Sequence, residues 1–473
     1  MKALTYAQKE RIGISYIFEQ LRPASPYGME RVRELAPIEL RSELLRQLEN
    51  VRRMLPVPED GTLRRMLQIF HGLKMLRPTV QKGRETDLNE IELFEIKRFL
   101  LQSAEILPLW RELQAQWQLD GVRLFNTEAA LNLLDPHGHR VASFFLEDDS
   151  SPLLTALRQE KRELEAALHK APSDELQARR SAVAAREEAE EQRLRSELSK
   201  NLRPYLSDIL ENMEAIGEID LTVEKVRLAR RFGGVYPEIS ENTLHFSQMR
   251  HPKIENFTAI SIDLPVGATV ITGANMGGKS VALKTLALNV YLIHCGLFPF
   301  AEAATCPLFE ELLFLAEDAE NMDNGLSSFG GEILRLQDSL QAIGAGFCLV
   351  LLDEFARGTN PDEGAALVQG LTEYLNALPV MAVLATHYDK VAQKANAHYQ
   401  VVGLRNAHGE ELADRLRGLD GAGSLKLLQQ YMNYGLYPVC DARDCPKDAL
   451  RICRLLGLDE KILSLVEKNY GIS

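Results

Sequence analysis

Residues 269–280 constrain the fold of this chain more than any other segment. They contain Gly273-Ala-Asn-Met-Gly-Gly-Lys-Ser280, which matches the pattern G-x-x-x-x-G-K-[ST]. An apolar, strand-like run precedes the loop at residues 268–271, and a helix-forming run begins at Val281. Because short apolar strands alternate with helical segments from about residue 242 onward, the sequence predicts a mostly parallel sheet with helices on both faces.

The loop has the composition of a phosphate-binding site. Its glycines let backbone N–H groups approach phosphate oxygens closely, and the N-terminus of the following helix adds a favourable partial charge. Lys279 would neutralise phosphate charge, and the Ser280 hydroxyl would ligate Mg²⁺. A chance glycine-rich turn is the alternative, and the flanking strand and helix argue against it.

Two later apolar strands end in polar residues. Residues 347–352 lead into Asp353 and Glu354, which suit a magnesium ligand and a base that polarises the attacking water. Simple solvent exposure of a strand end is the alternative interpretation. Residues 383–385 lead into Thr386 and His387, and in this architecture strand ends face the ligand. His387 is either a sensor of the γ-phosphate or a structural histidine.

A serine- and glycine-rich segment at residues 325–332 precedes another helix. Serine hydroxyls and glycine amides at a helix start can form an anion site, although such clusters are commonly caps and turns.

Composition and charge limit the class of protein. The chain has 473 residues, with 54 Lys and Arg against 67 Asp and Glu, so its formal net charge is −13. This balance excludes a uniformly basic coat for nucleic acid but leaves room for a local basic patch. The sequence shows neither a signal peptide nor an apolar run of about 18 residues. Together with only six cysteines, this predicts a cytoplasmic protein with reduced thiols and no membrane span.

The first half of the chain reads as helical. Between Arg158 and Lys200 ten acidic residues balance ten basic ones, and aromatic residues are absent. The segment predicts either two antiparallel helices that project from the body or a solvated helical linker.

Four strings together resemble the MutS family of ATPases, which are relatives of the ABC ATPases. They are TGANMGGKS (272–280), LSSFGGE (326–332), LVLLDEFARGTNPDEGAAL (349–367) and ATHYDKV (385–391). Met249-Arg-His-Pro252 further resembles the segment that opens the family's ATPase domain.

The resemblance implies ATP and Mg²⁺ as cofactors and a homodimer with composite sites. Ser280 and Asp353 would hold Mg²⁺, while Glu354 and His387 would act in catalysis. Ser327 and Ser328 would lie in a signature loop that reaches the partner's nucleotide, and residues 355–363 would link the two sites. The implied nucleotide-binding residues of the phosphate loop are Gly273, Ala274, Asn275, Met276, Gly277, Gly278, Lys279 and Ser280.

The resemblance also implies an α+β multidomain organisation, with a helical core, lever and short coiled arm followed by a phosphate-loop α/β domain of the ABC type. The expected divisions are a helical core and lever (1–152), a clamp-like arm (153–202), returning lever helices (203–241), the ATPase domain (242–403) and a C-terminal helical dimerisation element (404–473).

The sequence departs from the family pattern in several places. Val281 replaces the usual threonine after the phosphate loop, and Ser328-Phe-Gly-Gly is closer to the ABC form of the signature. We expect no mismatch-reading domain ahead of the helical region, and Phe145-Leu-Glu147 matches that domain's Phe-x-Glu by coincidence. Cys440, Cys445 and Cys453 lack a fourth zinc ligand and favour free thiols.

Two functions remain open for this ATPase. The first is a motor that clamps DNA without reading mismatches, although the charge of the chain does not strongly support DNA as the partner. The second is a remodelling factor for a protein client, such as a reactivating factor for a cobalamin-dependent aminomutase. A nucleotide-binding scaffold with slow turnover is a third, simpler possibility.

Overall fold

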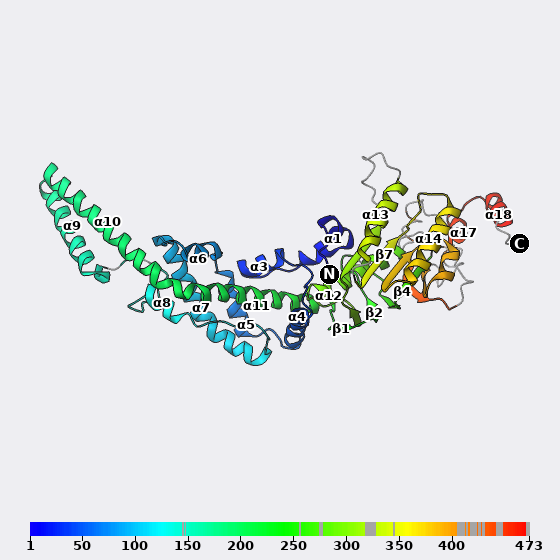
Figure 1. The fold of residues 1–473 in the computed structure, drawn as a ribbon, viewed down its shortest axis with the longest axis horizontal. Coiled ribbons are helices and arrows are strands. Elements are labelled where there is room, and N and C mark those ends of the chain that lie inside the picture. Colours follow the sequence, from blue (N-terminus) through cyan, green and yellow to red (C-terminus); the bar gives the residue numbers. More distant parts are fainter. Residues whose placement is uncertain are drawn as a thin grey trace. The chain divides into compact units, whose positions relative to one another are not determined.

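The structure of the chain is a computed structural model that describes residues 1–143, 146, 148–254, 257–273, 278–316, 328–343, 346–403, 412, 415–416, 423, 427, 431–440 and 448–469. It divides into two compact units, and several of their elements are labelled in Figure 1. The first unit comprises Met1–Leu21, Leu35–Arg52 and Lys225–Ser473, and the second comprises Arg22–Glu34 and Arg53–Glu224. Among the helices in these described ranges, none combines the length and apolar character needed to span a membrane.

A six-stranded sheet with the order β10-β9-β4-β8-β7-β6 lies at the centre of the first unit. Five of its strands are parallel, as the sequence predicted, and β10 pairs antiparallel with β9 at one edge. Every residue of β4 and β8 is buried, because helices cover both faces of these central strands. The strands are β4 (Gly267–Thr272), β6 (Glu311–Ala316), β7 (Cys348–Asp353), β8 (Val380–Ala385), β9 (Ala397–Gly403) and β10 (Asn433–Pro438).

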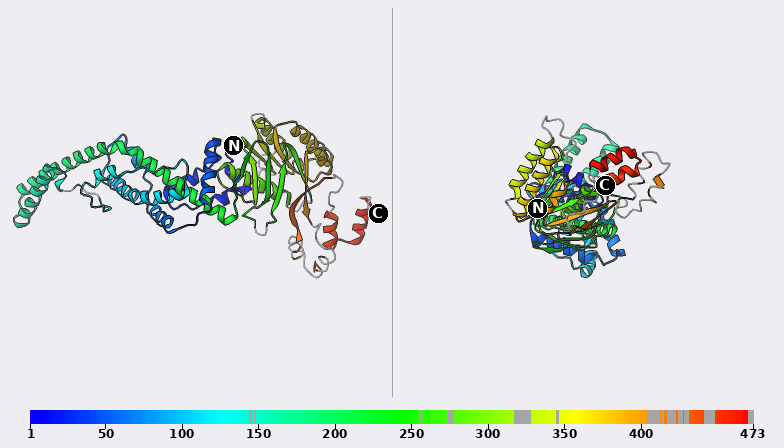
Figure 2. Two further views of the ribbon diagram at one scale, coloured as in Figure 1. Left: turned by 90° about the horizontal axis from the view of Figure 1, so that it is seen from below. Right: turned by 90° about the vertical axis from the view of Figure 1, so that its right-hand side faces the viewer.

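Helices pack on the sheet, whose strands lie side by side in the left view of Figure 2. Helix α12 (Gly278–His294) contacts β7 and β8, whereas α13 (Ser328–Ile343) and α14 (Pro361–Asn376) share a core with alternate residues of β4, β7 and β8. This core includes Val270, Val350, Leu352, Ala382, Leu384, Val368, Leu371 and Leu375. The alternation follows from the two-residue period of a strand, which sends neighbouring side chains to opposite faces.

A second, four-stranded sheet extends the first unit. Its order is β1-β5-β2-β3, and β2 is antiparallel to both of its neighbours. The strands are β1 (Glu238–Ser240), β2 (Leu244–Met249), β3 (Ile260–Leu264) and β5 (Ala303–Pro307). The sequence predicted β-rich segments here from about residue 242, and β1 begins slightly earlier.

The first helices of the chain belong with these sheets. They are α1 (Tyr6–Ile12), α2 (Ile14–Phe18) and α4 (Arg41–Met54, which lies in this unit up to Arg52). The Lys2 backbone N–H donates to the carbonyl of Glu310 at 3.0 Å, and His251 Nε2 contacts the carbonyl oxygen of Ile12 at 2.9 Å. Residues 1–152, for which we expected a helical core and lever, are divided between the two units.

The C-terminal segment contains a strand that the sequence did not predict. We expected a helical element over residues 404–473, and this is wrong for Asn433–Pro438, which forms β10. Two tyrosines in this short segment favour a strand once the edge of β9 is available for pairing. Helices α17 (Asp448–Leu455) and α18 (Glu460–Asn469) lie within the segment for which we expected a helical element.

The second unit is helical. Its helices are α3 (Pro26–Arg33), α5 (Gly61–His71), α6 (Arg77–Gly83), α7 (Glu90–Trp117), α8 (Glu128–Leu134), α9 (Pro152–Lys170), α10 (Asp174–Leu202) and α11 (Leu206–Phe232, which lies in this unit up to Glu224). Their buried faces carry large side chains such as Phe70, Phe99 and Trp110.

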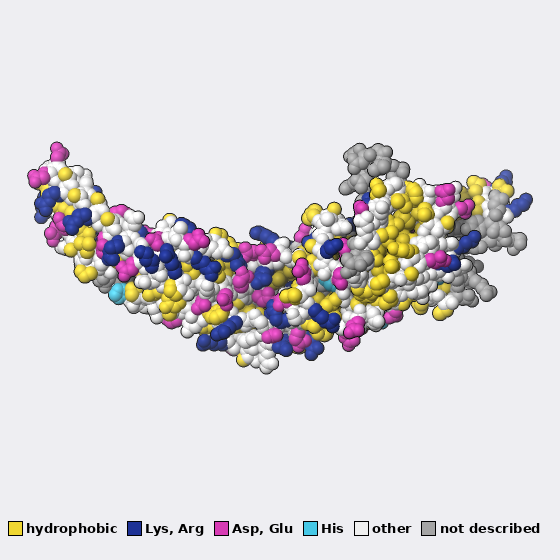
Figure 3. Space-filling model, in the orientation of Figure 1, with side chains coloured by type: hydrophobic (Ala, Val, Ile, Leu, Met, Phe, Trp, Pro, Cys, Tyr) yellow, Lys and Arg dark blue, Asp and Glu magenta, His cyan; other side chains and the backbone are white. Residues whose placement is uncertain are grey.

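Helices α9 and α10 form an antiparallel hairpin, here called the arm. Most of its arginines contact acidic residues of the same arm or of the segment that leads into it. Arg158 lies 2.8 Å from Asp148 and 2.9 Å from Glu191, and Arg180 lies 2.9 Å from Glu165. Figure 3 shows Lys and Arg interspersed with Asp and Glu over the arm. The arm therefore presents a mixed surface rather than a basic one.

A buried carboxylate on α11 anchors the turn that begins the second unit. The Ser25 backbone N–H and hydroxyl both donate to Asp220 Oδ2 at 2.6 Å, and the Ala24 N–H donates to Oδ1 at 3.0 Å. Burial raises the pKa of Asp220, although the three hydrogen bonds lower it. One turn further along α11, Glu224 accepts a hydrogen bond from the Arg22 N–H.

We predict that Asp220→Ala lowers the free energy of unfolding by about 3 kcal/mol, because it leaves buried donors without an acceptor. Urea unfolding followed by circular dichroism measures the change. Glu211→Ala, at an exposed position on the same helix, is the matched control and should stay within about 0.5 kcal/mol of the parent. Equal effects of the two substitutions would contradict this role of Asp220.

Candidate functional site

The glycine-rich loop leaves β4 at Gly273 and enters α12 at Gly278. A Cβ atom on Gly273 would lie 3.0 Å from Val401 Cβ, and one on Gly278 would lie 2.9 Å from Val401 Cγ1. Gly273 also has a φ angle of 143°, which favours glycine. Both ends of the loop therefore need glycine. Of the predicted loop residues, Ala274, Asn275, Met276 and Gly277 lie outside the described residues.

Lys279 is buried at the start of α12. Its Nζ donates to the carbonyl of Gly273 at 2.7 Å and lies 3.4 Å from Glu354 Oε1, with only 3% of the side chain exposed. Burial lowers the pKa of Lys279, while the negative charge of Glu354 raises it. The fold thus brings the predicted phosphate-binding lysine against the predicted base.

Ser280 and Asp353 meet beside this ion pair. The Ser280 hydroxyl donates to Asp353 Oδ1 at 2.9 Å. Burial raises the pKa of Asp353, the hydrogen bond from Ser280 lowers it, and the charge of Glu354 raises it further. A hydroxyl and a carboxylate in contact are oxygen ligands of the kind that Mg²⁺ takes. The two residues therefore fit the magnesium role that the sequence assigned to them.

Glu354 and His387 follow the carboxyl ends of the neighbouring parallel strands β7 and β8. Asp353 of β7 and Ile271 of β4 both lie in register with Ala385 of β8, two residues before His387. Glu354 is held by its backbone N–H, which donates to the Ala385 carbonyl at 2.9 Å. The His387 side chain is exposed, and its ring centroid lies 4.2 Å from that of Tyr388.

The signature residues are only partly placed. Ser328 is the first residue of α13, and Ser327 lies outside the described residues. Cys445 also lies outside them, whereas Cys440 and Cys453 are free thiols. Within the part of the chain that the structure describes, His, Cys, Asp and Glu form no cluster of three suited to a metal.

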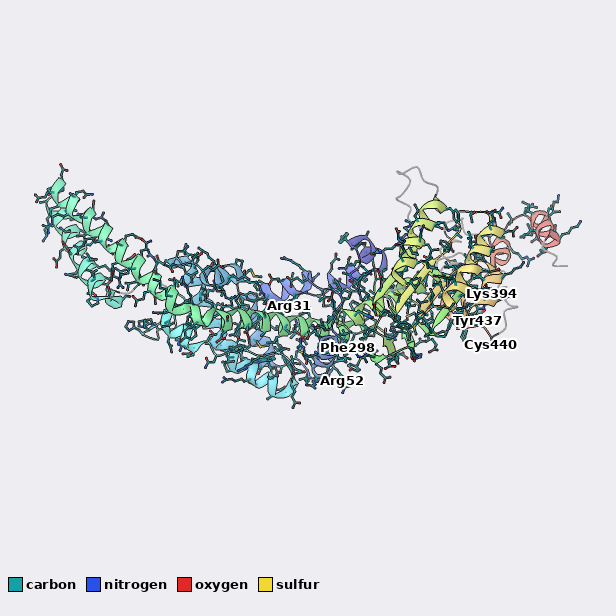
Figure 4. The ribbon with its side chains drawn as sticks, viewed as in Figure 1. Arg31, Arg52, Phe298, Lys394, Tyr437 and Cys440 are labelled. Atoms are coloured by element: carbon teal, nitrogen blue, oxygen red, sulfur yellow. The ribbon has the colours of Figure 1, made fainter. Side chains whose placement is uncertain are left out.

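Sequence reasoning missed several residues around this cluster. The Arg357 guanidinium lies 2.9 Å from Glu354 Oε2, and Glu332 accepts a hydrogen bond from the Ala356 N–H at 3.0 Å. Both residues stood in strings that carried the resemblance, which placed Arg357 among the linking residues 355–363 but gave neither residue a contact with the base. On the other side of the loop, the Thr272 hydroxyl contacts His398 Nε2 at 2.8 Å. Gln400 extends this contact to Tyr437, labelled in Figure 4.

A buried lysine that follows the glycine turn after a central strand, beside two carboxylates at the end of another strand, is typical of α/β ATPase domains. Residues 269–447 match the family model described as MutS domain V. This part of the chain is therefore similar to domain V of the MutS family.

Curated relatives agree with the family match. The chain is 32% identical over 223 residues to the "Endonuclease MutS2" of Leuconostoc mesenteroides, a match that covers 46% of this chain and 28% of the relative. It is 37% identical over 210 residues to that of Carboxydothermus hydrogenoformans, covering 43% and 27%. With that of Thermomicrobium roseum it shares 33% identity over 253 residues, covering 50% and 31%. The matches span less than a third of the length of these relatives.

We predict that Asp353→Asn raises the Mg²⁺ concentration needed for half-maximal ATP binding by about tenfold or more, since a neutral amide is a weaker ligand for a hard cation. Titration of Mg²⁺ with a fluorescent ATP analogue measures this. Asp338→Asn, at an exposed position on α13, is the control. An unchanged Mg²⁺ midpoint in Asp353→Asn would remove this residue from the metal site.

Proposed function

We propose that this protein binds ATP with Mg²⁺ and hydrolyses it at the carboxyl ends of strands β4, β7 and β8 of the six-stranded sheet. The observation that carries the proposal is the buried contact between Lys279 and Glu354, with Ser280 and Asp353 alongside. Buried charges are costly unless they are paired or functional, and clusters of perturbed groups gather at functional sites. The match of residues 269–447 to the family model described as MutS domain V supports the same activity.

Each side chain has a distinct role in this proposal. Lys279 and the N-terminus of α12 bind the phosphates, and His387 contacts the γ-phosphate from the end of β8. Ser280 and Asp353 hold Mg²⁺, which neutralises charge on the phosphate oxygens. Glu354 orients a water and accepts its proton as the water oxygen bonds to the γ-phosphorus and the bond to the ADP oxygen breaks.

We further propose that two copies of the chain form composite sites. Ser327 and Ser328, at the start of α13, would contact the nucleotide bound by the second copy, because a helix N-terminus and serine hydroxyls suit an anion. Loop residues Ala274, Asn275, Met276 and Gly277 would supply backbone N–H groups to the phosphates of their own copy.

We predict that Lys279→Ala abolishes ATP binding and hydrolysis, because it removes the buried cation that meets the phosphates. Glu354→Gln should lower kcat by about 100-fold or more while ATP still binds, since an amide accepts the water proton poorly. A phosphate-release assay and a nucleotide-binding titration separate the two effects. Lys394→Ala, a surface lysine labelled in Figure 4 and paired with Glu373, is the control. Undiminished turnover in Glu354→Gln would exclude it as the base.

Two proposals concern what the hydrolysis drives. The first is clamping of DNA, which the name of the relatives, endonuclease, favours. The second is remodelling of a protein client, for example reactivation of a cofactor-dependent enzyme such as a cobalamin-dependent aminomutase. The arm favours the second, because most of its arginines already contact carboxylates and a phosphate would have to displace those partners.

A salt titration distinguishes the two proposals. DNA clamping predicts binding to duplex or branched DNA that weakens as salt rises, with a log–log slope of about −0.9 for each phosphate contacted. The assay starts at about 20 mM salt, where electrostatic binding is strongest. Absence of binding at that salt eliminates the DNA clamp. Co-purification from nuclease-treated cytoplasm would then distinguish a protein client from a nucleotide-binding scaffold.

A further inference from the structure

The turn that follows β7 contains two residues in the left-handed region. Glu354 has a φ angle of 52° and Ala356 has a φ angle of 65°, although neither is glycine. A side chain makes this conformation unfavourable, and such residues persist only where their surroundings hold them. Ala356 is fully buried, so its backbone N–H and carbonyl also need partners within the protein.

Two side chains from different elements supply those partners. The Ala356 N–H donates to Glu332 Oε2 at 3.0 Å, and the Tyr388 hydroxyl donates to the Ala356 carbonyl at 3.1 Å. Glu332 lies in the first turns of α13, whereas Tyr388 follows His387 at the end of β8. The peptide groups on both sides of Ala356 are therefore each held by a side chain from a different part of the chain.

The surroundings keep the tyrosine in place. Burial raises the pKa of Tyr388, and the negative charges of Glu332 and Glu354 raise it further, so its hydroxyl keeps the proton that it donates. A Cβ atom on Gly364 would lie 2.3 Å from the Tyr388 hydroxyl oxygen, so the glycine leaves the space that this oxygen needs. The Tyr388 N–H donates to the Thr386 hydroxyl at 3.1 Å, which fixes the start of the same segment.

We propose that Glu332 and Tyr388 are positioning residues that hold the strained turn at Ala356 and thereby set the direction of the Glu354 carboxylate. This pair is called the Ala356 clamp. The clamp joins the helix after the signature loop, the end of β7 and the end of β8 through one residue. A shift of α13 or of the His387 segment therefore changes the geometry of the base through contacts within the protein.

The inference rests on the proposed hydrolysis of ATP, and its kinetic signature is specific. Glu332→Ala and Tyr388→Phe should each lower kcat by about tenfold, because the conformational free energy of one left-handed residue corresponds to a rate change of about that size. The KM for ATP should stay within about twofold of the parent value. KM is spared because Lys279 and Ser280 still bind the phosphates. Glu332→Gln keeps an acceptor oxygen and should stay within about threefold of the parent. Asp338→Ala, at an exposed position on α13, is the matched control.

A rescue experiment separates positioning from general stability. Glycine adopts the left-handed turn without steric cost, so Ala356→Gly should reduce the loss caused by Glu332→Ala from about tenfold to about threefold or less. Rescue of this kind supports the clamp. Turnover that is unchanged in both single variants, or a loss that Ala356→Gly leaves as large, would overturn it.

Amide hydrogen exchange tests the clamp independently of activity. The Ala356 amide should exchange at least about tenfold faster in Glu332→Ala than in the parent chain, because its acceptor is gone. An unchanged exchange rate overturns the clamp even where ATP is hydrolysed. A different outcome is that the parent chain hydrolyses no ATP while the Ala356 amide still exchanges faster in Glu332→Ala than in the parent. That result overturns the proposed function and leaves the hydrogen bond to Glu332 established.

Discussion

The burial of the Lys279 ammonium is the constraint on which the rest of the first unit depends. An unpaired buried charge costs several kcal/mol, so this lysine needs partners close by. The Gly273 carbonyl and the Glu354 carboxylate, at 2.7 and 3.4 Å, provide them. One partner follows β4 and the other follows β7, so the strand order β4-β8-β7 and its register must both be correct before the lysine can be buried.

The same constraint explains why the chain tolerates strain after β7. Glu354 has to leave the strand toward Lys279, and the following residues turn back through a left-handed conformation at Ala356. The Ala356 N–H donates to Glu332 and the Ala356 carbonyl accepts from the Tyr388 hydroxyl, so motifs far apart in the sequence meet around one residue. In contrast, arginines of the arm such as Arg158 and Arg180 already form ion pairs with acidic residues nearby. Phosphate groups would have to compete with these carboxylates for the arginines.

Much of the first unit was predictable because its signals are local. A glycine-rich loop between strand and helix, and apolar strands that end in Asp353-Glu354 and His387, each indicate structure without reference to distant residues. The rest depends on tertiary pairing. β10 forms because β9 offers an edge, α1 and α2 join the sheets through long-range contacts, and the acceptor role of Glu332 depends on the turn at Ala356. The spacing of residues along the chain does not predict these long-range contacts.

Calorimetric titration of the chain with a slowly hydrolysed ATP analogue tests the central claim most directly. If Lys279, Ser280, Asp353 and Glu354 form a nucleotide site, about one molecule should bind per chain. Removal of Mg²⁺ with EDTA should weaken that binding by about tenfold or more, because the phosphates would then lose the cation held by Ser280 and Asp353. Absence of saturable binding, or binding of equal strength with and without Mg²⁺, would contradict the account.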